Sequence, residues 1–177
     1  MDKQAVISLL EENHQIFISK ISSLSDTDFN RKIASKWTSS QQLEHIIKSV
    51  KPVDMAFSLP MFVLKMKFGL ANRPSKTYPD LVKKYLKTLE ENKGYEVPPE
   101  FTPEEIPLAR KEKSLKKLKK LASKLASRIP RFSEEELDTY ILPHPLMGKL
   151  TLREMLYFTA YHVEHHDRQI LENLKLK

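Results

Sequence analysis

Three of the six histidines in this chain lie in its last apolar segment, Tyr157 to Ile170. On a helix with about 100° per residue, His162 and His166 lie about 40° apart and one turn above each other. Both fall on an apolar stripe that contains Leu152, Met155, Thr159, Val163 and Ile170. Two imidazoles at this spacing can bind the same metal ion, which would offset the desolvation cost of burying them without partners. The pattern therefore predicts a metal site on this helix.

The third histidine of the segment, His165, lies roughly 60–100° away from that pair, near Gln169. We therefore expect His165 and Gln169 to contact a ligand residue or the substrate rather than the metal. A competing interpretation is that His162 and His166 are hydrogen-bonded core residues that bind no metal. The segment lacks the zinc-protease motif, in which glutamate directly follows the first histidine, because Val163 occupies that position.

Composition limits the chemistry and favours helices. The chain has no cysteine, which excludes disulfides, a thiol nucleophile and cysteine-bound zinc or iron–sulfur sites. Its 177 residues are 40% hydrophobic and include three glycines, which is typical of one helical domain spanning residues 1–177. The first residues, Met1 to Gln4, lack a basic leader, and no apolar run approaches the roughly 18 residues of a membrane span. We therefore expect a cytoplasmic protein without a membrane partner.

The net charge of +7 comes largely from one basic segment, Arg110 to Arg131. This segment keeps an apolar stripe of Leu115, Leu118, Ala122, Leu125 and Ile129. Lysines cover much of the remaining surface, which favours a bundle helix with a solvated face. No aromatic residue lies among these lysines to stack on bases, so we expect no specific nucleic-acid partner.

Apolar spacing and capping residues predict the remaining helices. The i, i+3, i+4 pattern predicts a first helix from Gln4 to Leu24. Ser39 and Gln42 fit a capping box, which predicts the start of a second helix. Pro52 and Pro60 are expected to kink or divide this second helix, because proline lacks the backbone N–H.

The second half of the chain contains the other two main helices. A proline-rich connection, Gly69 to Pro107, includes one short amphipathic helix from about Pro79 to Asn92, and the basic segment then forms the third helix. A loop from Leu142 to Gly148 precedes the fourth helix, which a capping box of Thr151 and Glu154 begins. Four main helices predict an all-α fold, a four-helix bundle.

An open metal site needs a third protein ligand, and His14, His45 and His144 are the remaining histidines. His45 lies about one and a half turns into the second helix, level with the pair on the fourth helix if these two helices are antiparallel. The long connection allows that arrangement, an up-down-down-up bundle with a crossover between helices two and three. On a helical wheel, however, His45 lies roughly 80° from the edge of its apolar stripe, so periodicity alone does not bury it.

The other two histidines fit the site less well. His144 precedes the fourth helix and would have to fold far back to reach the pair, so we expect it to have a structural role in its loop. His14 adjoins the apolar stripe of the first helix, and we expect it at the surface or at the edge of the core.

Three segments together carry a family resemblance. They are Trp37 to Ile46 (WTSSQQLEHI), Gly148 to Leu156 (GKLTLREML) and His162 to Ile170 (HVEHHDRQI). Their order, separation and helix placement resemble the DinB-like superfamily over most of the chain. The His144-Pro145 step before Gly148 also resembles a subgroup of this family.

The resemblance implies a four-helix bundle that binds a divalent metal ion, zinc or nickel, through His45, His162 and His166. It also implies an enzyme that acts on a small molecule, because the superfamily contains proposed metal-dependent hydrolases and S-transferases that use low-molecular-weight thiols. The sequence does not choose between these two reactions, and it identifies no catalytic acid or base.

A different class of function also stays open. The chain would then be a non-catalytic metal-binding bundle, a stress-associated binding protein whose lysine face meets an acidic partner. A homodimer is compatible with either interpretation.

Overall fold

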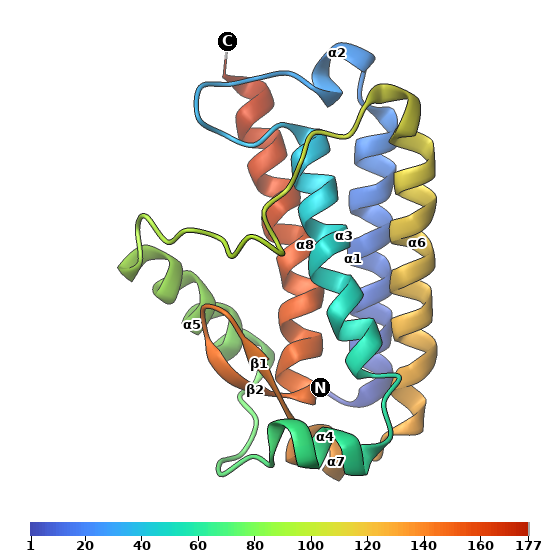
Figure 1. Cartoon of the computed structure of the whole chain (residues 1–177), viewed down its shortest axis with the longest axis vertical. Helices are drawn as coiled ribbons and strands as arrows, with labels where there is room; N and C mark the ends of the chain where they lie inside the picture. Colours follow the sequence, from blue (N-terminus) through green and yellow to red (C-terminus); the bar gives the residue numbers. More distant parts are fainter. Residues whose placement is uncertain (177) are drawn as a thin grey trace.

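Within residues 1–176, which the computed structural model describes, four long helices form a bundle (Figure 1). The long helices are α1 (Lys3–Ser23), α3 (Ser39–Ala56), α6 (Lys111–Arg128) and α8 (Leu152–Lys175). Shorter elements lie at the ends of the bundle and along one side: α2 (Asp26–Phe29), α4 (Met61–Phe68), α5 (Tyr78–Glu91), α7 (Glu134–Thr139), β1 (Ile141–His144) and β2 (Gly148–Thr151). The predicted all-α bundle is confirmed, and its β-hairpin is a small addition.

The first and last long helices, α1 and α8, are parallel neighbours. The Asn13 amide donates to the Ala160 carbonyl at 2.9 Å, and the Lys20 ammonium donates to the Asp167 carboxylate at 2.5 Å. Both pairs are 147 residues apart in sequence, as parallel helices require. Helices α3 and α6 run in the opposite direction (Figure 1), and they pack against each other, with α3 also packing on α8 and α6 also packing on α1. The predicted up-down-down-up order with a long crossover is therefore correct.

Capping side chains explain where α3 and α8 begin. The Thr151 hydroxyl accepts from the Glu154 N–H while the Glu154 carboxylate accepts from the Thr151 N–H, as predicted. At α3 the capping box uses Thr38 and Gln41 instead of the predicted Ser39 and Gln42. Both pairs satisfy the same sequence pattern, so the prediction was wrong by one residue. The side chain of Gln42 is consequently free to point into the protein.

Two prolines affect the second helix differently from one another. Helix α3 continues through Pro52, which lies inside it. The division comes later, where Pro60 precedes the first turn of α4. Proline is tolerated at such a start because the first helical N–H groups have no intrahelical acceptor.

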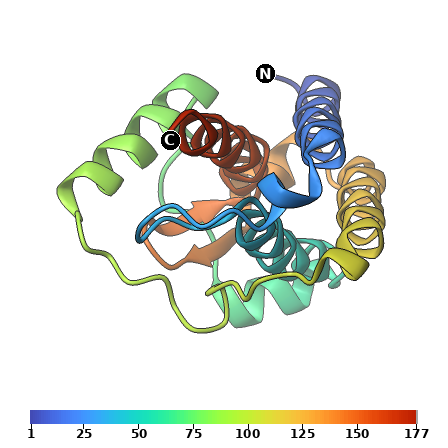
Figure 2. The same cartoon turned by 90° about the horizontal axis from the view of Figure 1, so that it is seen from above.

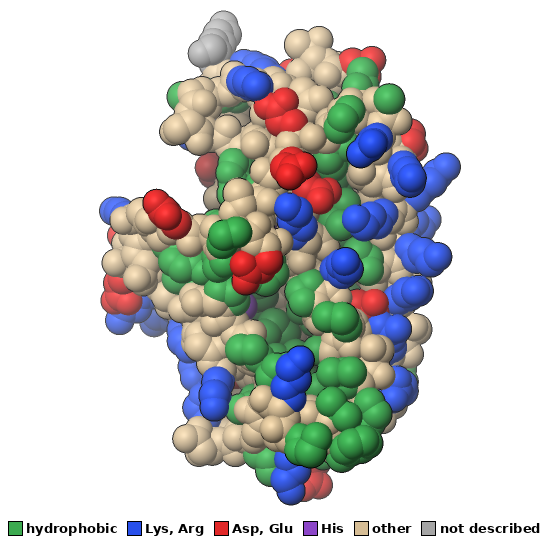
Figure 3. All heavy atoms as spheres, viewed as in Figure 1, with side chains coloured by type: hydrophobic (Ala, Val, Ile, Leu, Met, Phe, Trp, Pro, Cys, Tyr) green, Lys and Arg blue, Asp and Glu red, His purple; other side chains and the backbone are tan. Residues whose placement is uncertain are grey.

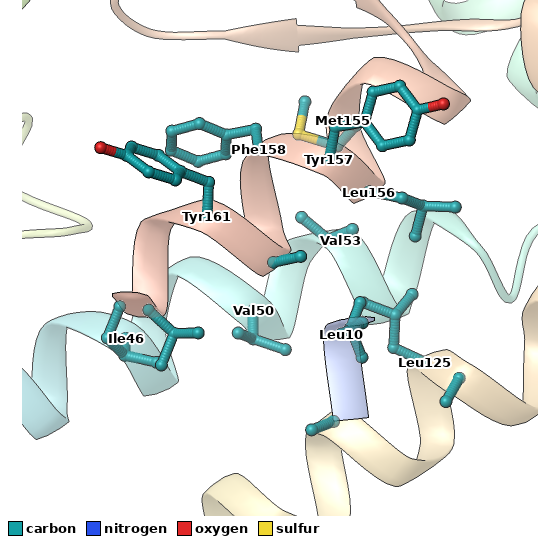
Figure 4. Close-up of a cluster of buried hydrophobic side chains, with 14 of the residues drawn as sticks. Leu10, Ile46, Val50, Val53, Leu125, Met155, Leu156, Tyr157, Phe158 and Tyr161 are labelled. Atoms are coloured by element: carbon teal, nitrogen blue, oxygen red, sulfur yellow. The ribbon is translucent and has the colours of Figure 1, made fainter. Parts of the chain in front are cut away.

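Aliphatic side chains from all four long helices form the core (Figure 4). Leu10, Val50, Leu125 and Leu156 represent α1, α3, α6 and α8, and each is at most 2% exposed. On α8, Phe158 lies on the side of the helix opposite Val50 and Leu10 (Figure 4). Because α8 is covered on both sides, its first half is buried around almost its whole circumference.

The second side of α8 is covered by elements outside the bundle. Helix α5 and the segment 92–107 lie beside α3 and α8, opposite α1 and α6 (Figure 2). The predicted loop Leu142 to Gly148 is instead part of an antiparallel hairpin with Ile141 opposite Thr151. Gly148 has a φ of +76°, a conformation that favours glycine, so this residue can close the hairpin turn. Two four-residue strands are too short to show alternation of apolar and polar residues, which is why no strand was predicted here.

Helix α6 carries the predicted lysine face along one edge of the bundle (Figure 3). Lys111 differs from the other lysines, because it is buried and its ammonium donates to the carbonyl oxygens of Ser22 and Leu24. This lysine therefore binds the end of α1 rather than facing solvent. None of the helices in residues 1–176 is long and apolar enough to cross a membrane.

Candidate metal centre

Three buried imidazoles from two helices converge on one point. His162 Nε2 lies 3.3 Å from His45 Nε2 and 3.0 Å from His166 Nε2. Tetrahedral zinc with bonds of about 2.05 Å requires nitrogen–nitrogen distances of about 3.3 Å, so the spacing suits a metal ion. One ligand atom from each residue lies within 4.8 Å of the others. The structure thus brings together the three histidines that the sequence proposed as ligands.

The first of them, His45, comes from α3, opposite the antiparallel helix α8. Its Nδ1 lies 2.8 Å from the carbonyl oxygen of Phe101, which can only accept a hydrogen bond. The proton of His45 therefore resides on Nδ1, and Nε2 has a free lone pair. The helical wheel left His45 outside the apolar stripe because the segment around Phe101, and not the bundle core, covers that face of α3.

The Gln42 side chain orients the second imidazole, His166. His166 Nδ1 lies 2.7 Å from Gln42 Oε1, which accepts a hydrogen bond from the Nδ1–H group, and both side chains are buried. The Nε2 lone pair of His166 therefore also points toward His162. Sequence reasoning missed this role because it assigned Gln42 to the capping box.

Aromatic side chains pack against the three imidazole rings and restrict their orientation. The Phe158 ring stacks on the His162 ring with a centroid distance of 4.7 Å. The Trp37 ring lies 4.9 Å from the ring of His45 and stacks at 6.1 Å on that of His166. Trp37 therefore packs directly against two of the three imidazoles.

Burial keeps these imidazoles neutral. Desolvation lowers the pKa of His162 and of His166 well below 6.5, and the neighbouring histidines lower both further. Burial also lowers the pKa of His45, against the opposing effect of its bond to Phe101. The Nε2 atoms of His45 and His166 both carry lone pairs, and a proton on His162 Nε2 could satisfy only one of them, whereas a divalent cation between the rings would accept all three nitrogens. The donor set therefore fits a metal ion.

His165 and Gln169, the two side chains expected beside the candidate ligands, contact each other next to the three imidazoles. The Gln169 amide donates to His165 Nε2 at 2.9 Å, and the His165 ring lies 5.3 Å from the His166 ring. Neither residue belongs to the converging group, but both line the adjacent pocket. Their placement off the histidine pair agrees with the helical wheel.

The converging imidazoles line a pocket of about 810 Å³ between the bundle and the elements outside it. Figure 3 shows histidine atoms inside this hollow. Most of its walls are apolar or aromatic, with contributions from Val53, Leu59, Tyr85, Leu89, Phe101, Leu142, Met155 and Phe158. Glu172 is the one carboxylate among the described residues that line it. The volume and apolar character suit a small organic molecule.

The predictions for the two other histidines, His144 and His14, differ in how well they agree with the structure. His144 has the predicted loop role, because its Nδ1 accepts from the N–H groups of Leu146 and Met147. The prediction for His14 was wrong: it is 1% exposed, and its Nδ1 lies 2.7 Å from the Leu10 carbonyl. Neighbouring helices cover the edge of the α1 stripe, which one helical wheel cannot show.

Comparisons with known proteins agree with this architecture. The chain is similar to the solved structure of YfiT from Bacillus subtilis, described as a probable metal-dependent hydrolase with an unusual four-helix bundle topology. The TM-score is 0.62 at 18% identity, over 96% of this chain and 84% of that chain, which shows a shared fold. Among curated proteins no match was found. The family model of the DinB superfamily matches residues 9–170, and the chain therefore belongs to that superfamily.

Proposed function

We propose that the protein is a metal-dependent enzyme that acts on a small organic molecule in its pocket. One observation carries this proposal: three neutral Nε2 atoms converge on one point at the wall of a largely apolar cavity of about 810 Å³. Three protein ligands leave coordination positions for water or substrate, which is typical of catalytic rather than structural sites. Imidazole ligands favour zinc or nickel among the common divalent ions.

A bound divalent ion would supply a Lewis acid and lower the pKa of a coordinated water or thiol toward neutrality. The protein holds two of the three imidazoles, those of His45 and His166, in the required tautomer through the Phe101 carbonyl and the Gln42 amide. Trp37 and Phe158 cover the imidazole rings and exclude water from that side. These contacts keep the ligand atoms in place before a metal arrives.

Two reactions fit this site, and they differ in the nucleophile. Hydrolysis uses water, and YfiT is described as a probable hydrolase. Transfer to sulfur needs a low-molecular-weight thiol as second substrate, because the chain has no cysteine. Among the described pocket residues outside the ligand set, His165 is an imidazole close to the centre that can exchange a proton with either nucleophile.

Activity measurements test the proposal. A panel of activated esters, amides and electrophiles should be offered with and without bacterial low-molecular-weight thiols. We expect turnover that chelation abolishes and that His162→Ala removes, while a matched change on the same helix, Glu164→Ala, leaves it. Turnover that survives both chelation and His162→Ala would contradict the proposal.

The non-catalytic binding protein makes an opposite prediction. Its lysine face would bind an acidic partner, so DNA binding at nanomolar concentration and physiological salt would favour it. For the proposed enzyme we expect weak DNA binding that falls steeply with salt, because lysine contacts to phosphate release counterions.

A further inference from the structure

The side chain of His144 is fixed in one tautomer by its own hairpin turn. Its Nδ1 accepts hydrogen bonds from the backbone N–H groups of Leu146 and Met147, both at 3.1 Å. A nitrogen that accepts hydrogen bonds carries no proton, so the proton of neutral His144 resides on Nε2. The turn therefore presents an N–H donor whose position does not depend on a ligand.

This donor faces the pocket and has no protein acceptor. His144 lines the cavity, and no residue in the described part of the chain accepts a hydrogen bond from its Nε2. Among residues 1–176, the fully enclosed side-chain atoms without a hydrogen-bond partner do not include His144 Nε2. This nitrogen is therefore accessible to a molecule in the cavity.

A second donor without a partner lies close by. Tyr85 of α5 lines the same pocket, and no residue in the described part of the chain hydrogen-bonds to its hydroxyl, which is not among the fully enclosed side-chain atoms without a partner. A molecule in the cavity can therefore reach this hydroxyl. The rings of His144 and Tyr85 both meet the Phe158 ring edge-on, with centroid distances of 4.3 and 5.2 Å. Two unused donors therefore lie around one phenyl ring.

The positions of these donors relate them to the metal centre. Phe158 stacks with its ring on His162, so one phenyl ring separates His144 from the three converging imidazoles. The Lys84 ammonium donates to the Met147 carbonyl, which joins α5 to the hairpin turn and adds a positive charge beside it. A negatively charged acceptor is therefore favoured here over a neutral one.

We propose that His144 Nε2–H and the Tyr85 hydroxyl form a subsite that binds a carboxylate group of the ligand. The subsite holds this carboxylate while another part of the same molecule lies at the three imidazoles. That the ligand is the substrate rests on the proposed function. Carboxylate binding itself does not, because both donors are present without a metal.

Benzoate is a suitable probe, since its ring matches the apolar walls and its carboxylate matches the donors. Nitrogen-15 NMR of the histidine rings reports the tautomer of His144 directly. We expect the Nε2–H form in the free protein and a saturable shift of its Nε2 resonance as benzoate is added. The titration is run on the protein as purified and again after chelation, so that carboxylate binding to a metal is separated from binding at the subsite.

Two substitutions separate the turn from the subsite. His144→Asn keeps an acceptor near the position of Nδ1 but has no donor that reaches the position of Nε2, whereas His144→Gln places an amide N–H near that position. We expect His144→Asn to weaken benzoate binding about tenfold with little change in thermal stability. His144→Gln should keep benzoate affinity within about threefold while destabilising the turn.

These measurements can disprove the carboxylate subsite independently of whether the proposed enzymatic function is correct. Undiminished benzoate binding by His144→Asn, or an Nδ1–H tautomer in the free protein, would disprove it. Tyr85→Phe gives an independent measurement, and we expect it to weaken benzoate binding about fivefold. If the protein binds benzoate in this manner but shows no metal-dependent turnover, the subsite proposal holds and the proposed enzymatic function is wrong.

Discussion

The carbonyl oxygen of Phe101 lies 2.8 Å from Nδ1 of His45, across 56 residues of sequence. A segment outside the bundle thus sets the tautomer of an imidazole that belongs to the bundle. The same segment lines the pocket, so the pocket wall and the orientation of a candidate ligand depend on one stretch of chain.

The three converging histidines should bind about one divalent ion per chain. Elemental analysis of protein purified without a nickel column measures the occupancy. His45→Ala, His162→Ala and His166→Ala should each lower it strongly, because each removes one ligand atom. His165→Ala should retain most of the metal, since its ring lies outside the group. Full occupancy after replacement of all three would refute the assignment.

Gln42→Leu should weaken metal affinity about tenfold, because His166 would lose the acceptor that fixes its tautomer. Competition with a chromophoric chelator measures the affinity. Gln15→Leu is the matched control, since this exposed glutamine donates to Ser19 on the same helix, α1, and lies outside the pocket that the three candidate ligands line. Equal losses in the two variants would show that the effect is not specific to His166.

Metal removal should leave the bundle folded. The apolar core includes residues from all four long helices and does not need an ion to hold it together. Circular dichroism after chelation should show unchanged helicity and a lower melting temperature. An unfolded metal-free chain would mean that the metal is structural.

The stability of the protein should fall in mild acid, partly through His14. Burial lowers the pKa of His14 to about 4 from 6.5, so the unfolded chain binds more protons between these values. The free energy of unfolding therefore decreases as pH falls through that window. His14→Leu should remove up to about 1.4 kcal/mol per pH unit of this slope. Urea denaturation at several pH values checks it, and parallel profiles for the two proteins would contradict the prediction.

Glu154→Gln should destabilise the fold by about 2 kcal/mol. The Glu154 carboxylate is fully buried and accepts from the Arg73 guanidinium and from two backbone N–H groups. The neutral amide would leave part of this network unsatisfied. Glu164→Gln, the same change on the same helix in an exposed ion pair, should have an effect below about 0.5 kcal/mol. Thermal denaturation compares the two.

Sequence periodicity predicted the parts of the site that depend on one helix. The relation between His162 and His166 follows from one-turn spacing, and the start of their helix follows from Thr151 and Glu154. These features are local, so residues a few positions apart determine them.

The features of the site that the sequence did not predict depend on contacts between segments that are distant in sequence. The burial of His45 by Phe101 joins two segments whose approach no helical wheel encodes. Gln42 was missed because two overlapping capping patterns compete at the start of α3, and the alternative pattern uses Thr38. His14 was placed at an edge because the helices that cover it could not be located from its own helix.

The pocket has two walls of different origin. One wall belongs to α3 and α8, which carry the three imidazoles, and the other to α5, the segment 92–107 and the β-hairpin. Substitutions or insertions in α5 or the β-hairpin can therefore reshape the cavity without altering the hydrogen bond that His45 donates to Phe101. In evolutionary terms, such a fold can acquire new ligand preferences while the three converging imidazoles stay constant.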